Sequence, residues 1–268
     1  MDLLKKYKWW IISGAVLIML TFPGYYFRVE LGYVANMIYY TLFDNSDAVG
    51  KERIAAFGIG LPKKFEIHGI DISRYQSKIE WNKLGKAEDN GVKISFIFIK
   101  ATEGADNYDR HFNYNWRQAK RYGLIRGAYH FYNPNVNSKL QAKNFIQTVK
   151  LEKGDLPPVL DIEITGRYSV DNTRLGIKNW LRIIEEHYHV KPVIYTSLGF
   201  YLKHIQNEGF SDYPFWIAHY YKPKLYLSSN LWTFWQHSDK GKVPGIRGNV
   251  DFNVFNGSSE ELQKLLVP

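Results

Sequence analysis

Two carboxylates stand close together in one apolar stretch of the chain. Asp161 and Glu163 occupy alternate positions of the segment VLDIEI, which begins at Val159. Alternate side chains of a strand point to the same side, with Cα atoms roughly 6.6 Å apart at about 3.3 Å per residue. Two carboxylates in a cleft of low dielectric constant push each other's pKa apart, so one keeps a proton while the other is ionised. Cleavage of a glycosidic bond requires such a pair of states.

Other acidic residues stand near the ends of further apolar runs. Asp71 lies in the first run, Glu103 follows the second just past Lys100, and Asp251 lies in the last. An acidic residue inside an apolar strand is costly unless it is paired or hydrated. A D-x-E pair alone is equally typical of a metal site or a buried ion pair. Asp71 and Asp251 favour catalysis, because the first and last strands are neighbours in a closed barrel.

Eight short apolar runs must position these carboxylates. The runs begin near Ile67, Ile94, Arg126, Pro158, Lys191, Pro214, Leu231 and Gly248. Short continuous apolar runs suit strands that are buried on both faces of a parallel sheet. The first five begin about 30 residues apart, which is the length of a βα unit.

Helices are predicted between the first five runs. They cover Ile79–Asn90, Tyr108–Tyr122, Ser138–Val149 and Val170–His187. The last three runs lie only about 16 to 23 residues apart, too close for full crossover helices. We therefore predict an α/β fold, an irregular TIM-like β/α barrel whose last third is shortened and connected by loops or a hairpin. In such a barrel the chemistry lies at the carboxyl ends of the strands.

The N-terminal region has the character of a membrane segment. Residues 9–27 contain no charge, three lysines precede them, and tryptophans and tyrosines lie at the two ends. This length approaches the thickness of a bilayer, and interfacial aromatic residues belong at such ends. Bulky residues follow the apolar run where a signal-peptide cleavage site would need small ones. An uncleaved signal anchor is therefore favoured over a cleaved signal peptide or a buried core helix.

These features divide the chain into four parts. Residues 1–8 form a cytoplasmic tail, 9–27 one transmembrane helix, 28–64 a juxtamembrane tether that includes turn signals, and 65–268 the catalytic domain. The excess of lysine before the apolar run keeps that end in the cytoplasm. We therefore expect a single-pass protein of the cell membrane with an extracytoplasmic catalytic domain, on its periplasmic or outer face.

Composition excludes several classes of function. The chain has no cysteine, which excludes a disulfide scaffold, thiolate metal sites and a cysteine nucleophile. The net charge of +9 suits a polyanion such as a wall polymer, a lipid or a nucleic acid, without choosing among them. No nucleotide loop, G-x-S-x-G elbow or nucleic-acid motif is present. His187 and His189 do not share a helix face, so we expect no metal site. Because no cofactor-binding motif is present, we also expect no cofactor.

Seven motifs follow one another over roughly the last 200 residues. They read GIDISRYQ (69–76), FIFIKATEG (96–104), GAYHFY (127–132), PVLDIE (158–163), PFWIAHY (214–220), WQHS (235–238) and VDFNVF (250–255). In order and spacing they resemble glycoside hydrolase family 25, the Ch-type lysozymes. The resemblance implies an irregular β/α barrel and N-acetylmuramidase activity, which is cleavage of the β-1,4 bond between N-acetylmuramic acid and N-acetylglucosamine in peptidoglycan.

The resemblance also implies roles for the four carboxylates. Glu163 matches the general acid, and Asp161 the residue that positions or stabilises the 2-acetamido group of the muramic sugar. Asp71 and Asp251 match residues that line the cleft and tune the pair. One departure is His237, where the family commonly has an aromatic residue after Trp-Gln, and it puts a subsite contact in question.

Six other residues are candidates for contact with the sugar: Tyr129, His130, Tyr195, Trp216, Glu103 and Gln236. Tyr129 and His130 end a strand, where an aromatic ring can stack on a sugar and the histidine can donate a hydrogen bond. They suit a packed core pair equally well. Tyr195 and Trp216 suit the floor of a sugar site or the filling of the barrel. Glu103 suits an ion pair with Lys100 better than a contact with substrate.

The sequence therefore predicts a monomeric, membrane-tethered peptidoglycan hydrolase whose partner is the glycan strand. Asp161 should lie beside Glu163 rather than across the sugar from it, because the two share one side of a strand. That placement favours retention, with the 2-acetamido group of the substrate as internal nucleophile. Two alternatives remain at this point: a non-catalytic glycan-binding module that uses the same cleft, and a related barrel hydrolase acting on another amino-sugar polymer.

Overall fold

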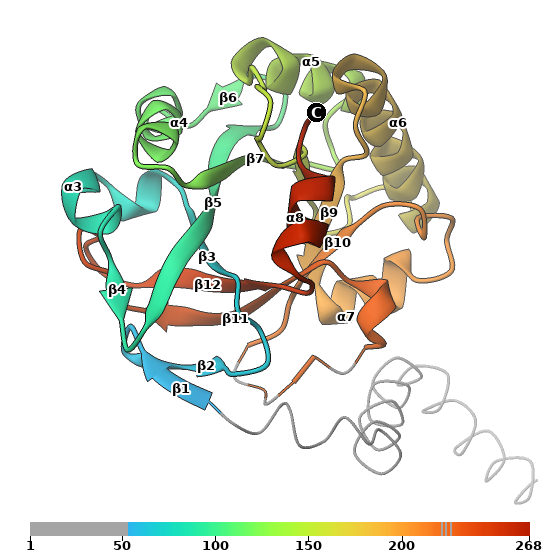
Figure 1. Cartoon of the computed structure of the whole chain (residues 1–268). Coiled ribbons are helices and arrows are strands. Elements are labelled where there is room, and N and C mark those ends of the chain that lie inside the picture. Colours follow the sequence, from blue (N-terminus) through green and yellow to red (C-terminus); the bar gives the residue numbers. More distant parts are fainter. Residues whose placement is uncertain (1–52, 221, 223, 226) are drawn as a thin grey trace, which may run out of the picture. The chain divides into compact units, whose positions relative to one another are not determined.

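The computed structural model in Figure 1 describes residues 53–220, 222, 224–225 and 227–268. The predicted cytoplasmic tail, the transmembrane segment over 9–27 and the first part of the tether, 28–52, lie outside the described residues. Among the residues that the structure describes, every helix is too short or too polar to cross a membrane.

Eight strands form a closed barrel (Figure 1). Around the barrel the order is β3 (His68–Ile72), β12 (Val250–Phe255), β11 (Phe234–Gly241), β10 (Phe215–Ala218), β9 (Val193–Ser197), β8 (Val159–Asp161), β7 (Ile125–Phe131) and β5 (Val92–Glu103). Pairing of β5 with β3 closes the ring. Each strand matches one of the eight apolar runs, so the predicted barrel is confirmed.

The last strand breaks the parallel pattern of the barrel. β12 runs antiparallel to both of its neighbours, β11 and β3, whereas the other neighbouring strands of the ring are parallel. A loop over 242–249 joins β11 to β12 in place of a crossover helix. This connection confirms the predicted hairpin-like end of the barrel.

Three long helices cover the outside of the barrel (Figure 1). They are α4 (Phe112–Arg121), α5 (Ser138–Thr148) and α6 (Val170–Tyr188), and each lies within a few residues of a predicted helix. The Ser169 side chain caps α6 by accepting a hydrogen bond from the backbone of Asn172 at 3.2 Å. The apolar face of α6, with Trp180 and Ile184 fully buried, packs inward.

The predicted helix over 79–90 is wrong after its first turn. Its helical part is the single turn α3 (Trp81–Leu84), and the chain then enters β4 (Glu88–Asp89), which pairs antiparallel with β5. Asn90 and Gly91 between these strands have φ values of 50° and 79°. Two consecutive residues with positive φ are typical of a tight hairpin turn, for which Asn-Gly is the favoured pair. This turn outweighs the helical spacing of the preceding residues.

The prediction of a tether is wrong for residues 53–62. β1 (Arg53–Ala56) and β2 (Ile59–Pro62) form an antiparallel hairpin. Phe57 in its turn is buried, with its ring 5.3 Å from that of Phe252 in β12, and its carbonyl accepts a hydrogen bond from the backbone of Lys242 at 2.7 Å. Burial of these apolar residues against the barrel joins the hairpin to the folded domain, ahead of the predicted boundary at 65.

Aromatic rings fill the interior of the barrel. Phe98 of β5 stacks on Trp216 of β10 with ring centroids 4.3 Å apart, and Phe96 and Phe234 pack beside them. Gly69 in β3 makes room for this layer, because a Cβ atom there would lie 2.4 Å from the ring of Phe96. The interior is therefore closed by packed rings beneath the carboxyl ends of the strands.

Short elements complete the fold. They are η2 (Arg74–Gln76), β6 (Asn107–Tyr108), α7 (Leu198–Phe200), the π-helical turn η3 (Tyr201–Ile205), η4 (Ser229–Leu231) and α8 (Ser259–Leu265). α8 packs Leu262 into the interior cluster that also contains Phe96, Leu156 and Phe255. The C-terminal helix therefore covers the amino-terminal end of the barrel and leaves the opposite end open for a site.

Candidate active site

A cleft of about 250 Å³ opens at the carboxyl ends of the barrel strands. Every barrel strand, or the residues directly after it, contributes to its wall. The four carboxylates that the sequence singled out all line it, together with Ile72, Ser73, Tyr75, Gln76, Lys100, Tyr129, Phe131, Tyr195, Trp216, Tyr220 and Gln236. Acidic residues from distant parts of the chain thus meet in one cavity.

Strand register brings these carboxylates together. Asp251 of β12 lies directly opposite Asp71 of β3 in their antiparallel pair. Asp161 is the last residue of β8, and the backbone N–H of Ile162 still donates to the carbonyl of Tyr195 in β9 at 3.0 Å. The strand geometry therefore continues past Asp161, and Glu163 reaches the same cleft.

Amide side chains hold Asp71 in place. Its Oδ2 accepts one hydrogen bond from Nδ2 of Asn253 and one from Nε2 of Gln236, each 2.8 Å long. The Oε1 atom of Gln236 in turn accepts hydrogen bonds from the hydroxyl groups of Tyr195 at 2.8 Å and Tyr220 at 2.6 Å. Four strands, β3, β9, β11 and β12, and the segment after β10 are thereby joined through one carboxylate.

The indole of Trp216 fixes the direction of this network. Its Nε1 can only donate, and it does so to Oδ1 of Asn253 at 2.7 Å. The amide nitrogen of Asn253 must then face Asp71, whose Oδ2 accepts from it. A tryptophan in the barrel floor thus orients a hydrogen-bond donor toward a carboxylate.

Asp71 and Asp251 share a proton. Burial raises the pKa of both carboxyl groups, and their side chains are hydrogen-bonded to each other. The amides of Asn253 and Gln236 oppose the rise at Asp71, whereas the negative charge of Asp71 adds to it at Asp251. Asp251 is therefore the protonated member of the pair, and its O–H group donates a hydrogen bond to the carboxylate of Asp71.

Asp161 lacks a hydrogen bond on one oxygen. The residue is buried, and its Oδ1 has no partner among the residues that the structure describes. Burial is the largest cause that raises its pKa, and the nearby charge of Glu163 raises it further, while Lys100 lowers it. An unpaired buried acceptor is unfavourable until a donor arrives, so Asp161 is prepared for a ligand N–H or O–H group.

Glu163 lies at the exposed side of the same cleft. Desolvation by the cleft walls raises the pKa of its carboxyl group, whereas the charge of Lys100 lowers it. The net direction is upward, toward retention of a proton at higher pH. Its exposure lets a substrate oxygen reach that proton, while Asp161 stays buried beneath.

Residues 70–246 match the sequence profile described as Glycosyl hydrolases family 25. The chain belongs to this family. It is a glycosidase of the lysozyme type, and the family resemblance read from the seven motifs is confirmed.

Relatives and solved structures agree with this membership of family 25. The chain is 44% identical over 232 residues to the uncharacterized protein YegX of Escherichia coli (strain K12), covering 85% of each chain. It is 35% identical to Lysozyme M1 of Streptomyces globisporus, covering 74% of this chain and 71% of that protein. The crystal structure of a bacterial lysozyme from Streptomyces coelicolor is similar with a TM-score of 0.66 and 33% identity, covering 74% of this chain and 96% of that one.

Four of the six predicted sugar contacts of this family 25 protein line the cleft. They are Tyr129, Tyr195, Trp216 and Gln236. Trp216 is almost completely buried, so it forms part of the floor beneath the carboxylates. Whether these residues bind a sugar stays a prediction.

His130 lies away from the cleft, so we withdraw it as a sugar contact. It alternates with Tyr129 on β7 and therefore points to the outer face of the barrel. There it is fully buried, its ring stacks on Trp180 of α6 at 5.6 Å, and its ring nitrogens lie 2.7 Å from Thr102 Oγ1 and 3.1 Å from Gln141 Oε1. Burial lowers its pKa to about 4, as expected for a neutral core histidine.

Glu103 and His237 also lie outside the set that lines the cleft. Glu103 forms an ion pair with Lys100, with 2.7 Å between Nζ and Oε2, which is the interpretation that the sequence favoured. His237 follows Gln236 on β11 and is buried on the other face, 5.5 Å from the ring of Trp235. The departure from the family motif at His237 therefore does not alter the cleft.

Among the residues that contact or line the acidic site without having been predicted from the sequence are Lys100, Tyr220 and Asn253. Strand alternation could have found Asn253, which shares a side with Asp251 in VDFNVF, and Tyr220, which follows Trp216 by four positions. No three histidine or acidic side chains in the described part of the chain are grouped so that they could hold a metal ion.

Proposed function

We propose that the cleft cleaves the β-1,4 bond between N-acetylmuramic acid and N-acetylglucosamine in peptidoglycan, with retention of configuration. The observation that carries this proposal is the pair Asp161 and Glu163, which lie on one side of the cleft with different surroundings. One carboxyl group is buried with an unpaired oxygen, and the other is exposed with a raised pKa. Such a pair can bind an amide and protonate a leaving oxygen at the same sugar.

Glu163 is the general acid in this proposal. Its raised pKa favours the protonated form at a higher pH than for an ordinary carboxyl group, and its exposure allows contact with the glycosidic oxygen. In the first step the proton moves from Glu163 to that oxygen, and the bond between the oxygen and the anomeric carbon breaks. In the second step the ionised Glu163 takes a proton from water.

Asp161 acts on the 2-acetamido group of the muramic sugar. The unpaired Oδ1 accepts a hydrogen bond from the acetamido N–H, which supplies the missing partner and favours the ionised form. The polarised amide oxygen then attacks the anomeric carbon and forms a five-membered oxazolinium ring. Water opens that ring from the opposite face, so two inversions give net retention.

Asp71 and Asp251 limit the total negative charge in the cleft. Their shared proton keeps the pair from carrying two full negative charges beside Asp161. The two amide donors to Asp71 keep that charge in one place. A negative charge fixed near the anomeric carbon stabilises the positive charge that develops there.

Replacement of Glu163 tests the general acid. Glu163→Gln removes the transferable proton and keeps the size of the side chain, so turnover of purified peptidoglycan should fall by about 10²–10⁴-fold. Loss of turbidity measures turnover, and circular dichroism checks that the variant is folded.

The matched control for this experiment is Glu66→Gln. Glu66 is exposed and lies outside the set that lines the cleft, so its variant should act like the wild type. Near wild-type turnover by a folded Glu163→Gln variant would contradict the role of Glu163.

The anomer formed first tests the stereochemistry. Proton NMR during hydrolysis should show the β-anomer of the new reducing end before mutarotation, as retention requires. A thiazoline analogue of the muramic sugar, which mimics the oxazolinium ring, should inhibit competitively. Initial release of the α-anomer would contradict retention and would make Asp71 or Asp251 a general base for an inverting reaction.

We also propose that residues 9–27 anchor the protein in the cell membrane, with the catalytic domain outside the cytoplasm. The uncharged segment, the three preceding lysines and the aromatic residues at its ends support this topology. The protein acts as a monomer in this proposal, because one chain supplies every residue that lines the cleft.

A reporter fusion tests this topology. A reporter at the C-terminus should be active only outside the cytoplasm, and the full chain should stay with membranes after an alkaline wash. Recovery of a soluble form that starts near residue 28 would show that the segment is a cleaved signal peptide.

A further inference from the structure

A second cavity lies at the other end of the barrel strands from the acidic cleft. Its volume is about 400 Å³, and it lies between η3, the residues that follow η3, and the segment 230–233 before β11. Phe215 and Thr233 at its wall lie at the amino-terminal ends of β10 and β11. Tyr220 and Gln236 of the acidic cleft lie farther along the same two segments. We call this cavity the base pocket.

The base pocket has an uncharged wall. None of the residues that line it is acidic, basic or histidine, although charged residues make up 23% of the chain. A charged ligand would lose its hydration there without gaining an ionic partner, which is strongly unfavourable. The wall therefore selects a neutral ligand.

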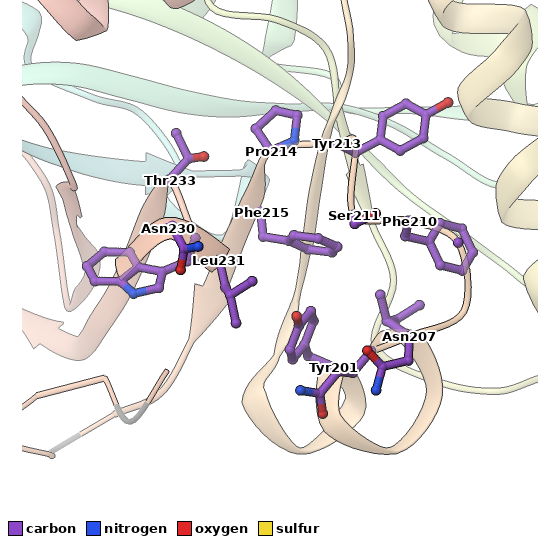
Figure 2. Close-up of a pocket in the computed structure, with 14 residues that line it drawn as sticks. Tyr201, Asn207, Phe210, Ser211, Tyr213, Pro214, Phe215, Asn230, Leu231 and Thr233 are labelled. Atoms are coloured by element: carbon purple, nitrogen blue, oxygen red, sulfur yellow. The ribbon is translucent and has the colours of Figure 1, made fainter. Parts of the chain in front are cut away.

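Aromatic rings form the inner part of the base pocket. Tyr201 of η3 and Phe215 of β10 meet edge to face with centroids 5.0 Å apart, and both are buried. Figure 2 shows these two rings and Phe210 around one common space. Rigid aromatic faces give apolar contact to the C–H groups of a flat, polar ligand such as a sugar ring.

The rim of the base pocket carries polar side chains that are free to bind. Asn207, Ser211 and Asn230 are exposed, and their side chains make no hydrogen bond to any residue that the structure describes. Figure 2 shows Asn230 and Asn207 on opposite sides of the space. Each carboxamide offers two donors and one acceptor, which matches the hydroxyl and acetamido groups of an amino sugar.

Two features of the wall are unusual for a purely structural cavity. η3 is a π-helical turn, in which the backbone N–H of Gln206 donates to the carbonyl of Tyr201 at 2.8 Å, and such turns are frequent at functional sites. Trp232 also lines the pocket, and its buried Nε1 has no acceptor in the described part of the chain. A ligand that packs against the Trp232 side chain would change the surroundings of this unpaired donor.

We propose that the base pocket is a second glycan-binding site that takes a neutral N-acetylated amino sugar. The ligand class follows from the uncharged wall, the aromatic interior and the carboxamide rim. In a peptidoglycan strand, N-acetylglucosamine fits this description better than N-acetylmuramic acid, which carries a lactyl or peptide carboxylate. The choice of peptidoglycan as the natural source rests on the proposed function, whereas binding of the sugar does not.

A binding experiment tests the base pocket without any need for catalysis. The full chain carrying Glu163→Gln is labelled with ¹⁵N-tryptophan and titrated with tri-N-acetylchitotriose, and the indole N–H signals are followed by NMR. Trp232→Phe assigns the base-pocket signal, and Trp216→Phe assigns the cleft signal. The Trp232 signal should shift with its own saturation curve, distinct from that of Trp216.

Charge placed on the rim separates the two sites. Asn230→Lys should weaken the response of Trp232 at least tenfold by filling the rim, and should leave the response of Trp216 unchanged. Ser229→Lys adds the same charge at the neighbouring exposed position outside the lining and should change neither response. In a chain with native Glu163, Asn230→Lys should raise the half-saturating concentration of insoluble peptidoglycan several-fold and leave turnover of a short soluble fragment unchanged.

Two results would overturn the proposal. A Trp232 signal that stays fixed while Trp216 saturates would mean that the base pocket binds no such sugar. A Trp232 shift that follows the Trp216 curve and persists in Asn230→Lys would mean that the shift is transmitted from the cleft. Undiminished turnover in Glu163→Gln would contradict the proposed catalytic role of Glu163 and would leave the binding result unaffected.

Discussion

The acidic cleft depends on holding four carboxyl groups together in a wall of aromatic rings. Lys100 is the positively charged side chain among the residues that line this cleft, and it is already paired with Glu103. Burial therefore raises the pKa of the carboxyl groups, and the folded chain binds more protons than the unfolded chain above the ordinary carboxyl pKa. Stability must then fall as the pH rises through the raised values, because ionisation is easier in the unfolded chain. This decrease in folding stability accompanies the arrangement that keeps protonated Glu163 beside the buried, unpaired oxygen of Asp161.

The barrel is built so that this arrangement cannot relax. The antiparallel strand β12 sets Asp251 against Asp71, and the same strand supplies Asn253, which connects Asp71 to the floor through Trp216. Parallel strand β8 brings Asp161 to the same height from the other side of the barrel. The interior below is filled by packed rings, so the carboxyl groups cannot move deeper into the barrel. The hydrogen-bonded amide of Gln236 restricts rotation of the Asp71 side chain. The irregular end of the barrel is thus part of how the site is positioned.

The sequence allowed the barrel and the acidic quartet to be predicted, since apolar runs and strand alternation depend on local chemistry. The prediction failed where one local signal outweighed another: the Asn90–Gly91 turn pairs β4 with β5, so the second half of the region 79–90 is not the expected helix. Residues 53–62 read as a tether because their burial depends on a distant partner strand. His130 has the polarity of a ligand-binding residue, and only its position on the outer face of β7 shows that it is a core residue. The hydrogen bonds of Asn253 could not be predicted, because they join strands that are far apart in the chain.

The pKa values of the cleft carboxyl groups test this account most directly. The free full-length protein, labelled with ¹³C at the side-chain carboxyl carbons of aspartate and glutamate, can be titrated by NMR, with Asp71→Asn, Asp161→Asn, Glu163→Gln and Asp251→Asn used to assign the signals. The account predicts that the Asp161, Glu163 and Asp251 signals keep their protonated positions above the usual carboxyl range of about 4. It also predicts that Asp71→Asn lowers the pKa of Asp251, because the adjacent negative charge is removed. Titration of all four groups at or below the ordinary value would contradict the account.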